Sequence, residues 1–218
     1  MGDPGHPLVA RLYDPVMTVP ERAFLPNHRE YLAADLSGTI LDVGAGTGAM
    51  FPYFADLDEG SRSLHAIEPD PHMRKQATDR AAKLGLDVEI ANGSAEDLPY
   101  ENDTFDTVVA SLVFCTIPDV ESAFDEVARV LNSGGEFRFL EHVRASGGVG
   151  AVHDVLAPGW YHAAGGCHLN RRTGDLFRAD DRFELLDYRR FDSGLTGFVP
   201  LIRGRLERRP ESLRSRLF

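Results

Sequence analysis

The stretch ILDVGAGTGAM, residues 40–50, joins an apolar strand pattern to a loop rich in glycine, which lets a ligand come close to the backbone. Gly44, Gly46 and Ala49 satisfy the relaxed G-x-G-x-x-A pattern of loops that hold a dinucleotide pyrophosphate. The pattern alone does not decide the ligand. Asp42, two residues before the first glycine, would repel a pyrophosphate but can accept hydrogen bonds from an ammonium group.

Two histidines are the candidate catalytic residues. His142 follows a predicted strand, where a parallel sheet opens its site, and His168 lies in the motif GGCHLNR, which core packing does not require. Imidazole titrates near neutral pH, so either could take a proton from a nucleophile. The structural alternatives are a hydrogen bond to a loop at His142, and bracing of a cap through Asn170 or Arg171 at His168.

The cysteines, Cys115 and Cys167, are expected to be small packing residues. They are too few for a disulfide framework, and they lack the spacing of a metal site. His153 and His162 complete no compact ligand set along the sequence. We therefore predict no metal.

Composition narrows the class of protein. A chain of 218 residues with 43% hydrophobic residues suits one globular domain. We find no apolar run long enough to span a membrane and no signal-peptide pattern, and we expect a reduced, cytoplasmic setting. The formal charge of -11 disfavours a nucleic-acid partner. The sequence indicates no oligomeric state.

Strand and helix patterns alternate along the chain, which predicts an α/β fold with a doubly wound, Rossmann-like sheet of seven strands and an antiparallel last strand. A helix is expected over residues 71–84, ended by Gly85, and another after the N-cap Asp119. Gly134 and Gly135 are expected to form a turn before the fifth strand. Residues 144–180 give the least regular pattern, and we interpret them as a small cap.

Four segments in order resemble the class I S-adenosylmethionine-dependent methyltransferases. They are ILDVGAGTG, the acid in HAIEPDPHM, the stretch GSAEDLPYENDTFDTVVAS and the stretch ARVLNSGGEFRFLEH. The resemblance covers most of residues 38–143 and implies S-adenosylmethionine as the cofactor. By that resemblance Asp42 meets the ligand's ammonium group, the glycines admit its methionine portion, and Glu68 binds its ribose hydroxyls. The full cofactor-binding set implied is Asp42, Gly44, Ala45, Gly46, Thr47, Gly48, Glu68, Pro69, Ser94, Ala95, Glu96 and Ser111.

Within this class the chain is most similar to the alkyl-thiol methyltransferase-like proteins and to the ubiquinone-biosynthesis-type enzymes. LVFCTI, FLEHV and the stretch WYHAAGGCHLNR carry the resemblance. It implies methyl transfer to a small molecule, with a thiol as the leading acceptor. The alternatives are C- or N-methylation of a quinone precursor or lipid headgroup, and a non-catalytic S-adenosylmethionine-binding regulator.

The expected organisation is a single domain with four parts. Residues 1–36 form a helical lid in which Tyr13 closes the pocket, and residues 37–143 form the cofactor-binding core. Residues 144–180 form the cap or substrate segment, and residues 181–218 hold the closing strands and a basic tail.

Overall fold

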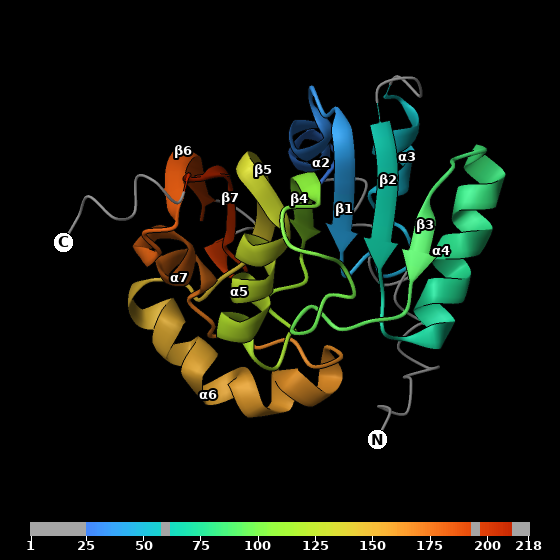
Figure 1. The fold of residues 1–218 in the computed structure, drawn as a ribbon. Helices are drawn as coiled ribbons and strands as arrows, with labels where there is room; N and C mark the ends of the chain where they lie inside the picture. The colour runs from blue at the N-terminus through green and yellow to red at the C-terminus, as the bar shows by residue number, and fades with distance from the viewer. Residues whose placement is uncertain (1–24, 58–61, 193–196, 211–218) are drawn as a thin grey trace.

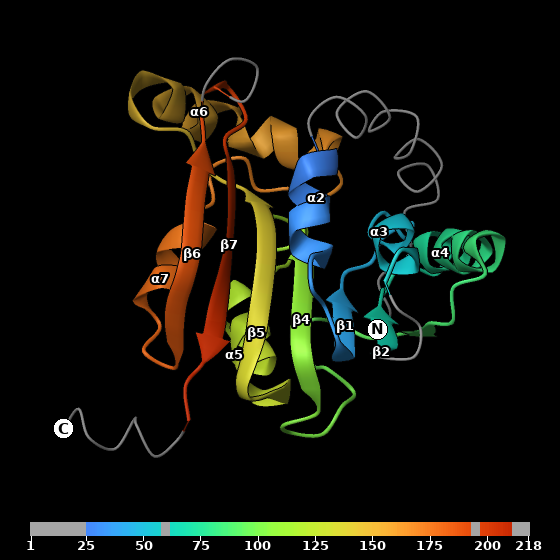
Figure 2. The ribbon, with the colours of Figure 1, turned by 90° about the horizontal axis from the view of Figure 1, so that it is seen from above.

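The sheet has the predicted architecture. The computed structural model describes residues 25–57, 62–192 and 197–210. Its seven strands lie in the order β3-β2-β1-β4-β5-β7-β6, which is labelled in full in Figure 1 and is seen from β2 to β6 in Figure 2. The strand bounds are β1 (Gly38–Val43), β2 (Arg62–Ile67), β3 (Glu89–Ala91), β4 (Phe105–Ser111), β5 (Leu131–His142), β6 (Phe183–Phe191) and β7 (Leu201–Arg208).

β7 is antiparallel to both of its neighbours, β5 and β6, whereas the pairings among β1 to β5 are parallel. The prediction of an antiparallel last strand is therefore confirmed. The parallel strands end at a common edge, since Val43 of β1 pairs with Ala110 of β4, and Ser111 pairs with Leu140 of β5. Figure 1 shows α6 (Gly147–Ala163) lying across this edge.

Helices pack on both faces of the sheet. One face buries β4 and β5 side chains against α5 (Val120–Val130) and α7 (Thr173–Ala179). The other face packs against α2 (Pro26–Ala33), α3 (Phe51–Ala55) and α4 (Pro71–Leu84). Successive residues such as Val108 and Val109 belong to opposite cores, which explains the unbroken apolar run from Val108 to Ala110 in β4.

The predicted helix ends are present. Asp70 caps α4, its carboxylate accepting hydrogen bonds from the amides of His72 and Met73, and Gly85 ends that helix with φ of 65°. Asp119 caps α5 by accepting from Ser122. Short polar side chains thus fix where two of the crossover helices begin.

Two expectations about local structure were wrong. Gly134 and Gly135 do not form a turn ahead of the fifth strand, because β5 already begins at Leu131. The pairing of β4 with β5 shifts register between Phe105 and Thr107, so the left-handed Gly134, at φ of 80°, belongs to an irregularity within the strand.

Residues 144–180 are also more regular than the sequence indicates, because they contain α6 and α7. Several apolar residues of α6 face solvent, Val155 among them at 79% exposure, so the helix lacks the apolar stripe that would predict it. Glycines and Pro158 within α6 weaken the pattern further.

Other expectations lie partly outside the described residues. Of the N-terminal lid only residues 25–36 are described, and Tyr13 lies outside them, as does the end of the basic tail. Among the helices that the structure describes, none is both long and apolar enough to cross a bilayer.

Candidate active site

The glycine loop after β1 has one open position. A Cβ added at Gly46, where φ is 58°, would meet no described atom within 4 Å. At Gly44 it would lie 2.1 Å from Cγ2 of Val113, and at Gly48 it would lie 2.7 Å from the Phe51 ring. The missing side chains of Gly44 and Gly48 thus make room for Val113 and for the Phe51 ring, and the close approach of a ligand to the three glycines stays a prediction.

Asp42 stands in β1 beneath this loop and is only 2% exposed. Its Oδ2 has no hydrogen-bond partner among the described residues. Burial raises the pKa of the Asp42 carboxyl to about 8, while the charge of Arg29 acts in the opposite direction. A buried carboxylate without a partner is costly, so this position favours a ligand that carries positive charge and hydrogen-bond donors.

Glu68 follows β2 and belongs to the same edge. Its Oε2 accepts a hydrogen bond from the amide of Gly46 at 2.9 Å, and its Oε1 accepts one from the amide of Asp70 at 2.8 Å. Burial raises the pKa of Glu68, and these two amides oppose that rise. The carboxylate is thus held in place beside the open position of the loop.

The remaining predicted cofactor residues line the same end of the sheet or the loops that leave it. Ala45 and Thr47 are buried within the glycine loop, and Pro69 is exposed beside Glu68. After β3, the hydroxyl of Ser94 donates to the carboxylate of Glu96, and Ala95 between them is buried. Ser111 ends β4, and its buried hydroxyl has no partner among the described residues.

These residues fit S-adenosylmethionine. The unpartnered Asp42 oxygen suits its ammonium group, the open Gly46 position gives it access to the backbone, and the Ser111 hydroxyl remains available. Leu112, which follows Ser111, has φ of 60°, a conformation that costs energy in a residue other than glycine and that recurs at functional sites.

The motif GGCHLNR ties the cap to the loop after β4. Arg171 donates from Nη1 to the carbonyls of Phe114 at 2.7 Å and Ile117 at 2.6 Å, and the backbone amide of His168 donates to the carbonyl of Cys115 at 2.8 Å. Leu169 is fully buried, and Asn170 donates to Asp154 of α6. The bracing predicted as an alternative is therefore present, although it runs through the His168 backbone and not its ring.

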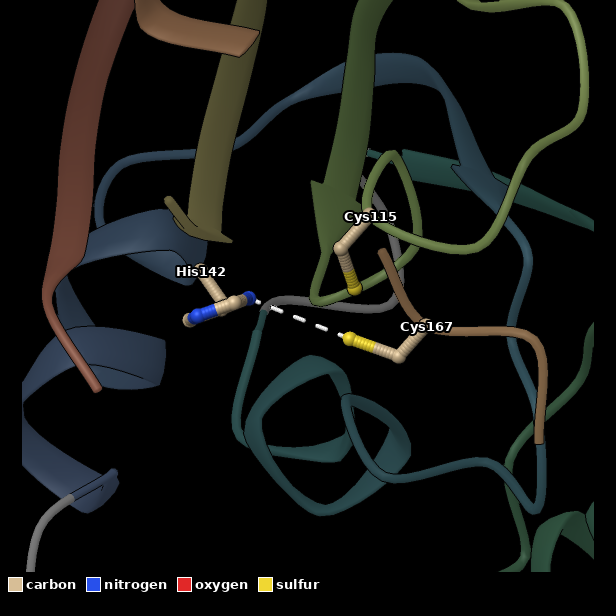
Figure 3. A group of neighbouring side chains, drawn as sticks. All are labelled: Cys115, His142 and Cys167. Atoms are coloured by element: carbon tan, nitrogen blue, oxygen red, sulfur yellow. Dashed lines mark hydrogen bonds between the residues drawn. The ribbon is translucent and has the colours of Figure 1, made fainter. Parts of the chain in front are cut away.

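This turn brings Cys167 to Cys115 and His142. The two sulfurs and one imidazole nitrogen lie within 4.8 Å of one another, and Sγ of Cys167 is 3.8 Å from Nδ1 of His142 (Figure 3). The hydrogen bond from the Cys115 thiol, and the neighbouring His142, hold the pKa of Cys167 below its ordinary value. That same bond raises the pKa of Cys115. The two cysteines and His142 thus form a compact group that their spacing in the sequence does not indicate, and His153 and His162 are not part of it.

Glu141 precedes His142 in β5 and binds the loop after β4. It is fully buried, and its Oε1 accepts the amides of Val113 and Phe114, each at 3.1 Å. Burial raises the pKa of its carboxyl to about 8, against these bonds. Sequence reasoning missed Glu141, although FLEHV places it beside His142.

The two candidate catalytic histidines differ in position. His142 is buried, and its Nε2 has no partner among the described residues. The ring of His168 packs against Tyr161, with 5.0 Å between ring centroids, and is not in the cysteine cluster. The structure thus brings His142, and not His168, to the two thiols.

Replacing Arg171 by methionine is expected to lower the free energy of unfolding by about 2 kcal/mol, because two charged hydrogen bonds to buried carbonyls are lost. Hydrogen exchange should quicken in the cap around residues 164–172. Arg172→Met is the control, since the Arg172 side chain donates no hydrogen bond within the described part of the chain. Equal stability of the two variants would contradict this role for Arg171.

The pH dependence of stability should reveal the buried Asp42. Its pKa is about 8 in the folded protein and near 3.8 when unfolded, so between these values the folded state holds an extra proton. The contribution of the protonated Asp42 carboxyl to the free energy of unfolding is therefore lost as pH rises from about 4 to about 8. Asp42→Asn lacks it, so urea titrations of the ligand-free protein should show the variant gaining stability over the wild type from pH 5 to pH 8. A difference that stays constant with pH would contradict the raised pKa.

The fold and the site together define a class of enzyme. An antiparallel β7 between β5 and β6, an acid before the glycine loop, and a second acid after β2 are the features of a class I S-adenosylmethionine-dependent methyltransferase. Residues 41–139 match the family described as the methyltransferase domain. The domain match and the relatives named as methyltransferases support this class, and they imply S-adenosylmethionine as the methyl donor.

Individual proteins agree with this class. The human thiol S-methyltransferase TMT1A is 29% identical over 167 residues, which cover 74% of this chain and 67% of the human protein. The ubiquinone/menaquinone biosynthesis C-methyltransferase UbiE of Brucella anthropi is 35% identical over 107 residues, 47% of this chain and 40% of that enzyme. Among solved structures, a putative sarcosine dimethylglycine methyltransferase from Galdieria sulphuraria has the same fold, with a TM-score of 0.71 at 15% identity, covering 92% of this chain and 98% of that one.

Proposed function

We propose that the protein transfers a methyl group from S-adenosylmethionine to the sulfur of a small thiol. The observation that carries this proposal is the extent of similarity. The alignment with human TMT1A spans 167 residues and so reaches well outside the methyltransferase domain at 41–139, whereas that with UbiE spans 107 residues. Similarity beyond the shared domain favours a shared acceptor class.

The donor end of the site follows from the glycine loop. We assign the ligand's ammonium group to Asp42 and its ribose to Glu68, with Gly46 giving backbone access. When bound, S-adenosylmethionine supplies a methyl carbon to which the thiolate sulfur of the acceptor can bond. The bond between this carbon and the sulfonium sulfur then breaks, and its electron pair stays on the sulfur of the cofactor. The predicted roles of Ser94, Ala95 and Glu96 at the adenine belong to the same proposal.

The acceptor end lies at the edge formed by β4, β5 and the cap. A thiol must lose its proton before it is an effective nucleophile. We assign this assistance to His142, since its imidazole is buried beside the only sulfur cluster of the described residues and keeps an unpartnered nitrogen. Glu141 holds the backbone of the loop that carries Cys115. His168, the second candidate, would line the cap through its ring.

A methyl-transfer assay across acceptor classes tests the proposal. Purified protein with S-adenosylmethionine carrying a radiolabelled methyl group is offered an alkyl thiol, an amine, a phenol and a quinone precursor at equal concentration. We expect labelled thioether to form at least 10-fold faster than any other product. Faster labelling of the quinone precursor or of the amine would replace this proposal with the C- or N-methylation alternative. Cofactor binding without any labelled product would favour a regulator.

A further inference from the structure

We propose that Cys115, His142 and Cys167 bind a Zn²⁺ ion and leave its fourth position to the sulfur of the acceptor. The ion site rests on the geometry of the three residues alone. Only the identity of the fourth ligand rests on the proposed function.

The ligand atoms are close to the separations that zinc requires. Tetrahedral zinc with Zn–S bonds of about 2.3 Å and Zn–N bonds of about 2.0 Å places sulfur and nitrogen ligands roughly 3.5–3.8 Å apart. Sγ of Cys167 and Nδ1 of His142 are 3.8 Å apart, and all three atoms lie within 4.8 Å of one another. Side-chain shifts of less than about 1 Å would complete the geometry.

The three residues come from segments that the fold fixes in place. His142 ends β5, Cys115 lies in the loop after β4, and Cys167 lies in the turn after α6 (Figure 3). The turn is attached to the Cys115 loop by the amide of His168 and by the Arg171 guanidinium. The amides of Val113 and Phe114 in this loop in turn donate hydrogen bonds to the carboxylate of Glu141. Such preorganisation avoids the cost of gathering three ligands from a mobile chain.

The donor set selects the kind of ion. Two sulfurs and an imidazole suit zinc and other soft or borderline ions, whereas Mg²⁺ and Ca²⁺ prefer oxygen. Two thiolates balance the charge of a divalent ion, so binding adds no net charge to this buried place.

The number of ligands indicates an open position. Among the described residues, Cys115, His142 and Cys167 are the only His, Cys, Asp or Glu side chains in this group of possible ligands. Structural zinc sites have four protein ligands, whereas catalytic sites have three and hold water or substrate in the fourth position. Cys115 and His142 are buried but Cys167 is partly exposed, so the open side is that of Cys167.

This arrangement explains how an acceptor thiol could be activated beside the buried Cys115 and His142. An acceptor thiol that binds the ion gives up its proton to solvent and becomes a thiolate, since a coordinated thiol is deprotonated. Nδ1 of His142 then assists by ligating the ion, and no separate general base is required.

Metal binding is tested on the full chain, purified under reducing conditions, stripped with a chelator and titrated with Zn²⁺ alone against a chromophoric competitor. Co²⁺ serves as a spectroscopic probe, because thiolate ligation gives it an intense near-ultraviolet charge-transfer band. We expect one tightly bound ion per chain, and loss of the band, or at least 10-fold weaker binding, in Cys115→Ser, Cys167→Ser and His142→Gln. His162→Gln is the control, since His162 is an exposed histidine on the same cap.

S-adenosylmethionine affinity, measured by calorimetry, shows that each variant is folded and should stay within about 3-fold of the wild type. Absence of one-to-one Zn²⁺ binding, a Cys115–Cys167 disulfide in its place, or equal weakening in His162→Gln would overturn the site.

Two further results separate the zinc site from the proposed function. Thiol methylation that survives complete removal of zinc would contradict the ion's catalytic role but not the function. Specific zinc binding without thiol methylation would support the site and refute the function.

Discussion

Replacing Asp42 by asparagine is expected to weaken the binding of S-adenosylmethionine by about 100-fold, the effect of losing a charged hydrogen-bond partner within a buried site. Oδ2 of Asp42 is buried without a partner in the described residues, and burial raises its pKa to about 8. A cationic donor from the ligand would stabilise the carboxylate there. Asparagine offers an oxygen but no charge, so the ligand's ammonium group loses its counter-ion.

Calorimetric titration of the wild type and of Asp42→Asn checks this expectation, and Asp87→Asn, at an exposed aspartate before β3, is the control. The ligand-free Asp42→Asn protein should be at least as stable as the wild type at pH 8, because it no longer buries an ionisable carboxyl. Wild-type affinity in Asp42→Asn would show that the ammonium group binds elsewhere.

The second large effect is expected at Gly44. An alanine there would place its Cβ 2.1 Å from Cγ2 of Val113, at a φ of 66° that alanine rarely adopts. Overpacking and backbone strain together should lower the free energy of unfolding by roughly 3 kcal/mol and the Tm by roughly 10 °C.

Gly46→Ala provides the contrast, because its Cβ would meet no described atom within 4 Å. We expect a loss of stability of only about 1 kcal/mol from its positive φ, but at least 10-fold weaker binding of S-adenosylmethionine as the methyl group occupies ligand space. Thermal unfolding and calorimetry measure the two effects separately. If Gly46→Ala bound the cofactor normally, the open position would not belong to the ligand site.

The order of elements could be predicted because its signals are local. Asp70 and Gly85 mark the ends of α4 within the sequence itself, and the apolar run of β4 indicates a strand covered on both faces. The positions of Asp42 and Glu68 in the fold could also be predicted, because Asp42 directly precedes the end of β1 and Glu68 directly follows β2.

The cap could not be predicted in this way. The four glycines of α6 and its Pro158 disfavour a helix, and its apolar residues, Val155 among them, are not buried against the sheet. The motif GGCHLNR did mark the turn that ties the cap to the Cys115 loop, yet this bracing depends on carbonyls of a loop that is distant in the sequence.

The cysteine cluster could not be predicted for a related reason. Cys115, His142 and Cys167 come from three elements, and only the parallel pairing of β4 with β5 and the docking of the cap bring them together. No spacing rule for metal ligands applies to such a set, since those rules describe ligands that are close in sequence.

The most direct test of thiol methylation is a competition in one tube. Protein and S-adenosylmethionine carrying a trideuterated methyl group are mixed with equal concentrations of an alkyl thiol, an amine and a phenol, and products are identified by mass spectrometry. We predict that the deuterated methyl group is found on sulfur, in an amount equal to the S-adenosylhomocysteine formed, and that His142→Gln slows this product at least 10-fold. Deuterated methyl groups on nitrogen, oxygen or carbon with unmodified thiol would contradict the proposed function.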